Sequence, residues 1–212
     1  MDSAANAESE LAARLRAGDP SALAELFDQH RERLWRLVNF RLDHRLLGRV
    51  DADDLLQESY LAAAKRIAHF GANPALSPFV WLRLVVCQTL VDLHRHHLGA
   101  QQRSAGREVD LQGGPWSQTT SAALANQLVG NFTSPSQVVS RAEMVQKVEQ
   151  AIGQMNPTDQ EILALRHFEE LTNSEVAEAL GIEQKAASIR YVRALNRLQA
   201  ILAEVPGLLN ET

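Results

Sequence analysis

The chain has 212 residues, 45% of them apolar and 22% charged, and its formal net charge is -5. This length allows one or two domains with a buried core, and the excess of acid means that nucleic-acid binding requires a local basic patch. The single cysteine, Cys87, excludes an intramolecular disulfide. Neither a membrane-spanning apolar run nor a signal peptide is recognisable. We therefore expect a soluble, cytoplasmic protein.

Helix signals with clear ends fill the first half of the chain. Gly18 stops a short helix, Asp19 caps the next one, and Pro20 lies in its first turn. Apolar residues spaced three or four apart carry that helix to about residue 47. Asp51 opens a third helix that reaches about residue 70, and a fourth runs from about residue 79 to 98. Four aromatic residues at helical spacings are expected in the core: Phe27, Trp35, Phe40 and Trp81.

The middle of the chain differs in composition from both flanks. Residues 99–140 are rich in Gly, Ser, Thr, Gln and Asn. This composition predicts a linker of about 40 residues between an N-terminal domain, residues 1–98, and a C-terminal domain, residues 141–212. The Ala and Leu content of residues 121–129 leaves open a short helix within the linker.

The second domain is also predicted to be helical. Asn156 and Pro157 begin a helix, after one that ends near Gly153. A further helix, which Thr172 opens, ends at Gly181, and the last runs from about residue 184 to 202. Strand patterns are absent from the sequence, so the predicted fold class is all-α, with two small helical domains.

Residues 172–198 have the spacing of a helix-turn-helix motif. Ala177 lies four residues before Gly181, and apolar residues surround both. The last helix carries Lys and Arg but no acid between residues 184 and 203. An ordinary helical hairpin with a solvated basic face is the alternative. Because the turn spacing and the charge segregation coincide, we favour DNA binding.

The motif also indicates how the last helix would meet DNA. Six residues face the groove: Glu183, Gln184, Lys185, Ser188, Ile189 and Val192. Arg190, Arg193 and Arg197 lie to the flanks and are expected to contact phosphates. The side chain of Gln184 is expected to pair with adenine, and that of Lys185 with guanine. Ile189 either packs into the core or meets a thymine methyl, and the sequence does not favour one over the other.

A stripe of acids marks the third helix. Asp51, Asp54 and Glu58 are spaced to share one helix face. Favourable interaction with the helix dipole explains acids in the first turn of the helix. Gln57 and Glu58 lie beyond the first turn, where this effect fades. With Leu55 beside them, these residues predict a mixed polar and apolar docking face for a basic partner helix.

These segments together resemble a known family. Residues 156–198 resemble the promoter-binding C-terminal domain of bacterial sigma factors, and residues 51–63 (DADDLLQESYLAA) are similar to the acidic helix with which that family grips RNA polymerase. Residues 81–97 are similar to the helix that faces the −10 promoter element. Two helical domains joined by a linker match the small extracytoplasmic-function group.

The resemblance implies a sigma factor that binds core RNA polymerase and directs it to promoter DNA. The polymerase-binding residues would be Asp51, Asp54, Leu55, Gln57 and Glu58. The −10 element would be contacted by Asn73, Arg83, Gln88, Asp92, His94 and Arg95. The −35 element would be contacted by Gln184, Lys185, Ser188, Ile189, Arg190, Arg193 and Arg197. Such a protein is not an enzyme, has no cofactor, and has an anti-sigma factor as a further candidate partner.

The chain departs from the family pattern at two places. The fourth helix has Cys87 and Gln88 where an Arg-Asn pair is usual, and histidines among the following arginine positions, so phosphate attraction is weaker. Lys185 begins a Lys-Ala-Ala run where Gly-Thr-Val is usual, so we expect a different promoter sequence. Cys87, His94 and His97 lack the fourth ligand of structural zinc, and we expect no metal.

Two other classes of protein stay open from the sequence. The main alternative is a two-domain helix-turn-helix regulator that acts without polymerase, but such a regulator has no need of the acidic helix at residues 51–58. The other is a scaffold or enzyme with an incidental helical hairpin. No catalytic constellation stands out in the sequence to support an enzyme.

Overall fold

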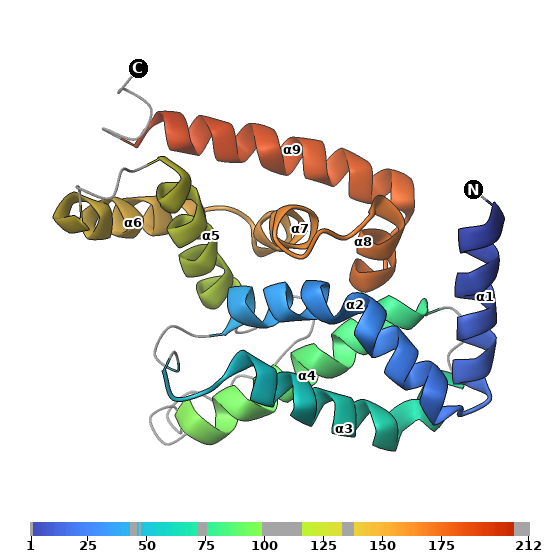
Figure 1. The fold of residues 1–212 in the computed structure, drawn as a ribbon. Coiled ribbons are helices and arrows are strands. Elements are labelled where there is room, and N and C mark those ends of the chain that lie inside the picture. Colours follow the sequence, from blue (N-terminus) through green and yellow to red (C-terminus); the bar gives the residue numbers. More distant parts are fainter. Residues whose placement is uncertain are drawn as a thin grey trace. The chain divides into compact units, whose positions relative to one another are not determined.

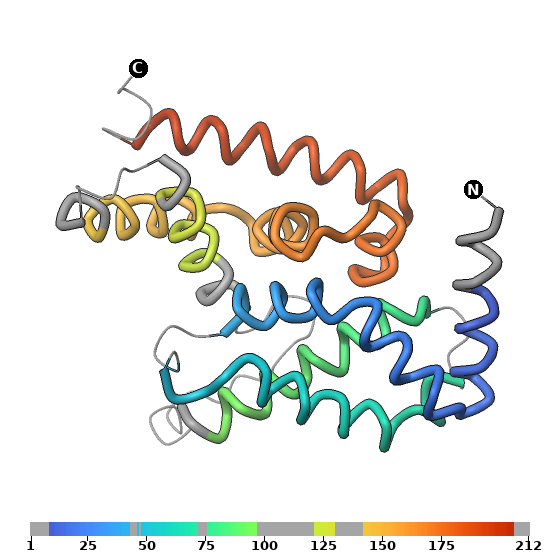
Figure 2. The backbone as a smooth tube through the Cα atoms, in the orientation of Figure 1, coloured from blue at the N-terminus to red at the C-terminus, as the bar shows by residue number. Residues whose placement is uncertain are grey.

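The computed structural model describes residues 2–42, 46, 48–71, 76–98, 116–132 and 138–205. Side chains are described for residues 9–42, 46, 48–71, 76–96, 121–129 and 142–205. The secondary-structure elements formed by these residues are helices, with no strand among them, which confirms the all-α prediction. The chain divides into two compact units, Met1–Ala105 and Gly106–Thr212 (Figures 1 and 2). No helix in the described part is long and apolar enough to cross a membrane.

Helices pack around an aliphatic core in the first unit. The described helices are α1 (Asp2–Arg16), α2 (Pro20–Arg41), α3 (Ala52–Gly71) and α4 (Pro78–Leu98). α2, α3 and α4 pack against one another, and α1 packs against α2 and α3 (Figure 1). The core is mainly leucine and valine, with aromatic rings from Phe70, Phe79 and Trp81. Phe70 and Trp81 lie with their ring centroids 5.2 Å apart, which ties the end of α3 to α4.

The predicted start of α2 is confirmed in detail. The carboxylate of Asp19 accepts the backbone N–H of Ser21 at 2.9 Å and its hydroxyl at 2.7 Å. Gly18 precedes it at φ +80°, a conformation that favours glycine. The hydrogen bonds from Ser21, followed by the one from Arg14, hold the pKa of Asp19 at about 2. This capped turn fixes where α1 ends and α2 begins.

The end of α2 and the place of Trp35 differ from the sequence prediction. α2 ends at Arg41, six residues before the predicted end near residue 47, and Leu42 is extended with ψ 125°. Leu42 and Leu46 are nevertheless buried, so the continuing apolar spacing marks burial of the connecting segment and not helix. Trp35 is 44% exposed because α2 buries the opposite face, which contains Leu37. The other three aromatic residues predicted in the core are buried.

The second unit is also helical. Its described helices are α5 (Trp116–Phe132), α6 (Val138–Gly153), α7 (Pro157–His167), α8 (Asn173–Leu180) and α9 (Gln184–Ala203). α9, the long red helix of Figure 1, packs against α7 and α8 and more lightly against α6. α7 begins at a cap in which the side chain of Asn156 accepts the N–H of Thr158 at 2.8 Å, as the Asn-Pro signal predicted.

Helix α5 lies within the segment that composition assigns to the linker. It packs against α6 and α7, and Leu124, Ala125 and Val129 are fully or almost fully buried. The short helix left open at residues 121–129 is therefore present and longer, because its apolar residues have a surface against which to pack. Residues 99–115 and 133–137 of the predicted linker lie outside the described residues. The domain boundaries at 98 and 141 stay a prediction.

Candidate DNA-binding and partner-binding surfaces

The turn between α8 and α9 has the geometry that the helix-turn-helix motif predicted. The hydroxyl of Thr172 accepts the N–H of Glu175 at 3.2 Å, and the Glu175 carboxylate accepts the N–H of Thr172 at 2.7 Å. This capping box opens α8. Gly181 ends it at φ 61°, where the left-handed region favours glycine. Ala177 is buried where the two helices meet, so the direction of α9 is set by local contacts.

α9 has one buried face and one exposed, cationic face. The buried residues are Ala187, Ala194, Leu198 and Leu202. Most of the residues predicted to contact the −35 element lie on the exposed side: Gln184, Lys185, Ile189, Arg190 and Arg193, with Ser188 half-buried. Because α9 contains no acid, this face presents cations without an opposing charge on the same helix.

Ile189 does not pack into the core. Its residue is 44% exposed, and Val192, three positions along α9, is 54% exposed. The sequence left two alternatives open for Ile189. The structure does not show the first of them, burial in the domain core.

Arg197 is engaged with the protein itself, contrary to its predicted place among the phosphate contacts. Its guanidinium donates to the carboxylate of Asp159 on α7 and forms an ion pair with it. Asp159 is 6% exposed. The sequence assigned Arg197 from its position on α9 alone, because nothing local shows that a buried carboxylate from α7 lies against it.

A second polar contact joins α9 to α7. The hydroxyl of Tyr191 and Nε2 of His167 are 2.9 Å apart, and the guanidinium carbon of Arg166 lies 5.3 Å from the centre of the Tyr191 ring. Partial burial, and then the charge of Arg166, lower the pKa of His167. The unprotonated nitrogen of a neutral imidazole can accept a hydrogen bond from the tyrosine hydroxyl, so this contact suits an uncharged His167. Nothing in the sequence indicates this contact, because the two residues are 24 positions apart.

The acidic face of α3 is present, with two corrections to its members. Asp54, Gln57 and Glu58 are exposed as predicted. Asp51 precedes the helix, and its carboxylate accepts the N–H of Asp53 at 2.8 Å, so it has a capping role. Leu55 is 1% exposed and packs into the core, because it follows the buried stripe of α3.

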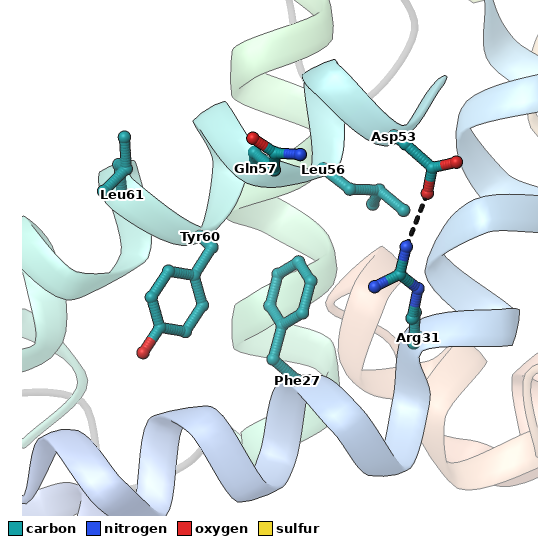
Figure 3. Close-up of a pocket in the computed structure, with 7 residues that line it drawn as sticks. All are labelled: Phe27, Arg31, Asp53, Leu56, Gln57, Tyr60 and Leu61. Carbon is teal, nitrogen blue, oxygen red and sulfur yellow. Dashed lines mark hydrogen bonds and ion pairs between the residues drawn. The ribbon is translucent and has the colours of Figure 1, made fainter. Parts of the chain in front are cut away.

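Leu61 supplies the exposed apolar member of this face in place of Leu55. It is 59% exposed and lies one turn beyond Glu58. Leu61 borders a pocket between α2 and α3, and Figure 3 shows the rings of Phe27 and Tyr60 side by side in its lining. The remaining lining residues are Leu56, Gln57 and the ion pair of Arg31 with Asp53, in which nitrogen and oxygen are 2.6 Å apart (Figure 3). The spacing of three residues from Glu58 was the signal that could have found Leu61.

Of the six residues predicted to contact the −10 element, four are accessible, one is buried and one lies outside the described residues. Asn73 lies outside the described residues. Arg83 is only 6% exposed, because it lies between Val80 and Cys87 on the buried face of α4, so it is not available to DNA in this structure. The other four lie on the accessible side of α4 or at its margin: Gln88 and His94 half-buried, Asp92 and Arg95 exposed.

The fold defines an all-α protein whose C-terminal unit contains a helix-turn-helix. Residues 151–200 match the family model for sigma-70 region 4. The chain is 24% identical over 195 residues to the ECF RNA polymerase sigma factor BldN of Streptomyces coelicolor, covering 92% of this chain and 66% of the relative, about two thirds of its length. It is 22% identical to the ECF RNA polymerase sigma factor SigW of Bacillus subtilis, covering 91% of this chain and 95% of that one.

A solved structure, that of CnrH in complex with the cytosolic domain of CnrY, has a similar fold. The TM-score is 0.51 at 21% identity, over 93% of this chain and 97% of that one. The sequence comparisons agree with the resemblance to RNA polymerase sigma factors of the extracytoplasmic-function type that the motifs predicted.

Proposed function

We propose that this sigma factor binds core RNA polymerase through the exposed face of α3 and places α9 in the major groove of the −35 promoter element. The observation that carries the proposal is the separation of charge between the two helices. The first turns of α3 expose carboxylates, whereas the charged side chains of α9 are all cations. One surface suits a basic protein helix and the other suits DNA phosphates.

The α3 face combines charge with an apolar contact. Asp54 and Glu58 are four residues apart and therefore neighbours on the helix surface, and Leu61 extends this face by one turn. Carboxylates around an exposed leucine match a partner helix that presents basic residues around an apolar one. The adjoining pocket, lined by Phe27 and Tyr60, gives a side chain of that helix a place to pack (Figure 3).

On α9, the proposed contacts fall into two kinds. Gln184 and Lys185 lie at the N-terminal end of the helix, where recognition helices meet base edges. Arg190 and Arg193 are exposed and are proposed to contact phosphates. Arg197 instead fixes the helix to α7 through Asp159.

For the −10 element we propose contacts by the exposed side of α4. The amide of Gln88 donates to the carboxylate of Asp92 at 3.0 Å, which holds both side chains on the same side of the helix. Arg95 is exposed at the next turn and supplies a fixed positive charge for phosphate. Arg83 is a core residue in this proposal.

An anti-sigma factor is proposed as a second protein partner. CnrH, whose fold is similar, was solved with the cytosolic domain of CnrY. The α3 face and the exposed apolar residues of α9 are surfaces that such a partner would have to cover in order to block both polymerase and DNA.

Transcription from a library of genomic fragments tests the function directly. Purified chain and core polymerase are incubated with the fragments, and the transcripts are sequenced. We expect start sites that depend on the chain and share an upstream sequence. Identical start sites with and without the chain would contradict the proposal. A regulator that acts without polymerase would bind DNA fragments but would not bind core polymerase.

A further inference from the structure

The outer face of α9 carries two exposed apolar side chains near its centre. Ile189 is 44% exposed and Val192 is 54% exposed. Residues three apart are neighbours on a helix surface, so the two side chains form one small apolar patch. The other large apolar residues that are exposed in the described part of the chain, Trp35 and Leu61, belong to the first unit.

Stability of the helix does not explain this pair. The core side of α9 is already formed by Ala187, Ala194 and Leu198. Isoleucine and valine are also weaker helix formers than the Lys, Arg and Gln residues that fill other exposed positions of α9. Helix stability therefore gives no reason for apolar side chains at these two exposed positions.

The charges around the patch indicate what covers it. Lys185 lies one turn before Ile189, Arg193 lies one turn after it, and both are exposed. Arg190 is exposed beside them, and α9 contains no acid. A ligand that fits this surface is polyanionic at its edges and apolar between them. Duplex DNA has this character in its major groove, where phosphates border the groove and thymine presents a methyl group.

We propose that Ile189 and Val192 contact the C5-methyl groups of thymines on neighbouring base pairs, so that this sigma factor reads part of its −35 element through methyl groups. The inference rests on the proposed position of α9 in the major groove. Three residues of helix advance about 4.5 Å along the axis, and successive base pairs are about 3.4 Å apart. The two side chains are thus spaced for adjacent base pairs.

Replacing thymine with uracil tests the proposal, because it removes only the methyl group. The probe is a promoter duplex with a randomised −35 segment, prepared once with thymine and once with uracil in that segment. Holoenzyme assembled from the full chain and core polymerase selects binding sequences from each library. We expect sequences with neighbouring thymines from the first library. We expect binding to weaken about fourfold for each methyl group lost when uracil replaces thymine in a selected duplex.

Variants assign the effect to the two residues. Ile189→Ala with Val192→Ala is expected to bind thymine and uracil duplexes equally, whereas Gln199→Ala, an exposed change farther along α9, should keep the wild-type preference. Thermal unfolding confirms that the variants are folded. Equal binding of both duplexes by the wild type, or a preference that persists in the double variant, would overturn the proposal.

Two further outcomes separate this inference from the function on which it rests. A chain that fails to bind core polymerase, or a holoenzyme that selects no sequence, overturns the proposed function and the inference with it. Selection of a defined sequence without any effect of uracil overturns the inference alone.

Discussion

The guanidinium of Arg197, near the end of α9, forms an ion pair with the carboxylate of Asp159 in the first turn of α7. Asp159 is 6% exposed, whereas the Arg197 side chain is 59% exposed. A buried carboxylate is costly without a partner, so the exposed arginine compensates for its desolvation. The ion pair therefore fixes the recognition helix to the domain core.

Substitution of Arg197 should reduce stability more than substitution of Arg193. Arg197→Gln leaves the buried carboxylate of Asp159 without its cation and is expected to lower the free energy of unfolding by about 1–3 kcal/mol. Arg193→Gln alters an exposed side chain and is expected to change it by about 0.5 kcal/mol or less. Urea unfolding measures both. Equal losses in the two variants would show that the ion pair contributes nothing specific.

In DNA binding, substitution of Arg193 should have the larger effect and substitution of Arg197 the smaller one, the reverse of their effects on stability. Arg193 is exposed and is proposed to contact a phosphate, so Arg193→Gln should weaken binding to all sequences about equally. The dependence of log affinity on log salt should become shallower by about one unit. Arg197→Gln should leave this slope unchanged, because its guanidinium is held by Asp159. A shallower slope in the Arg197 variant would show that Arg197 contacts a phosphate after all.

Charge reversal on α3 should separate polymerase binding from stability. Asp54→Lys with Glu58→Lys places cations opposite a basic partner, which is expected to cost several kcal/mol of binding to core polymerase. Both residues are exposed, so the melting temperature should hardly change. Asp51→Ala is the matched comparison. It removes the cap on Asp53, so it should lower stability by about 1 kcal/mol and affect binding less. Undiminished binding by the double reversal would refute the assignment of this face.

Local features of the fold were predictable from the sequence. The caps at Asp19, Asn156 and Thr172 and the turn at Gly181 depend on residues within a few positions of one another, and the structure has each of them. The exposed face of α9 also followed from periodicity, because its buried residues recur every three or four positions.

Features that depend on distant contacts were not predictable in this way. The burial of Arg83 and the exposure of Trp35 depend on which neighbouring helix covers each face, and periodicity does not contain that information. The pairing of Arg197 joins residues 38 positions apart. Leu61 was missed and Leu55 misplaced, because the apolar stripe of α3 has to be aligned with α2 and α4 before its outward member is known.

Helix α5 should contribute to the stability of the second unit. Leu124 is 1% exposed where α5 packs on α6 and α7, so Leu124→Ala is expected to lower the free energy of unfolding by about 2–4 kcal/mol. A fragment that begins at residue 116 should accordingly melt at a higher temperature than one that begins at residue 141. Equal melting temperatures would support the composition-based boundary, with α5 outside the folded domain.

The contact between His167 and Tyr191 should make the second unit sensitive to acid. Partial burial and the charge of Arg166 lower the pKa of His167 below its ordinary 6.5, so the unfolded chain takes up this proton at a higher pH than the folded chain. The stability that neutral His167 contributes to the folded state is therefore complete above about pH 6.5, and it is lost as the pH falls toward the pKa of His167 in the folded chain. Urea midpoints measured from about pH 7.5 to 5.5 should stay level above about pH 6.5 and decline below it. They should decline less in His167→Gln, which carries no titrating proton. An identical decline in both proteins would exclude His167 as the source of the acid sensitivity.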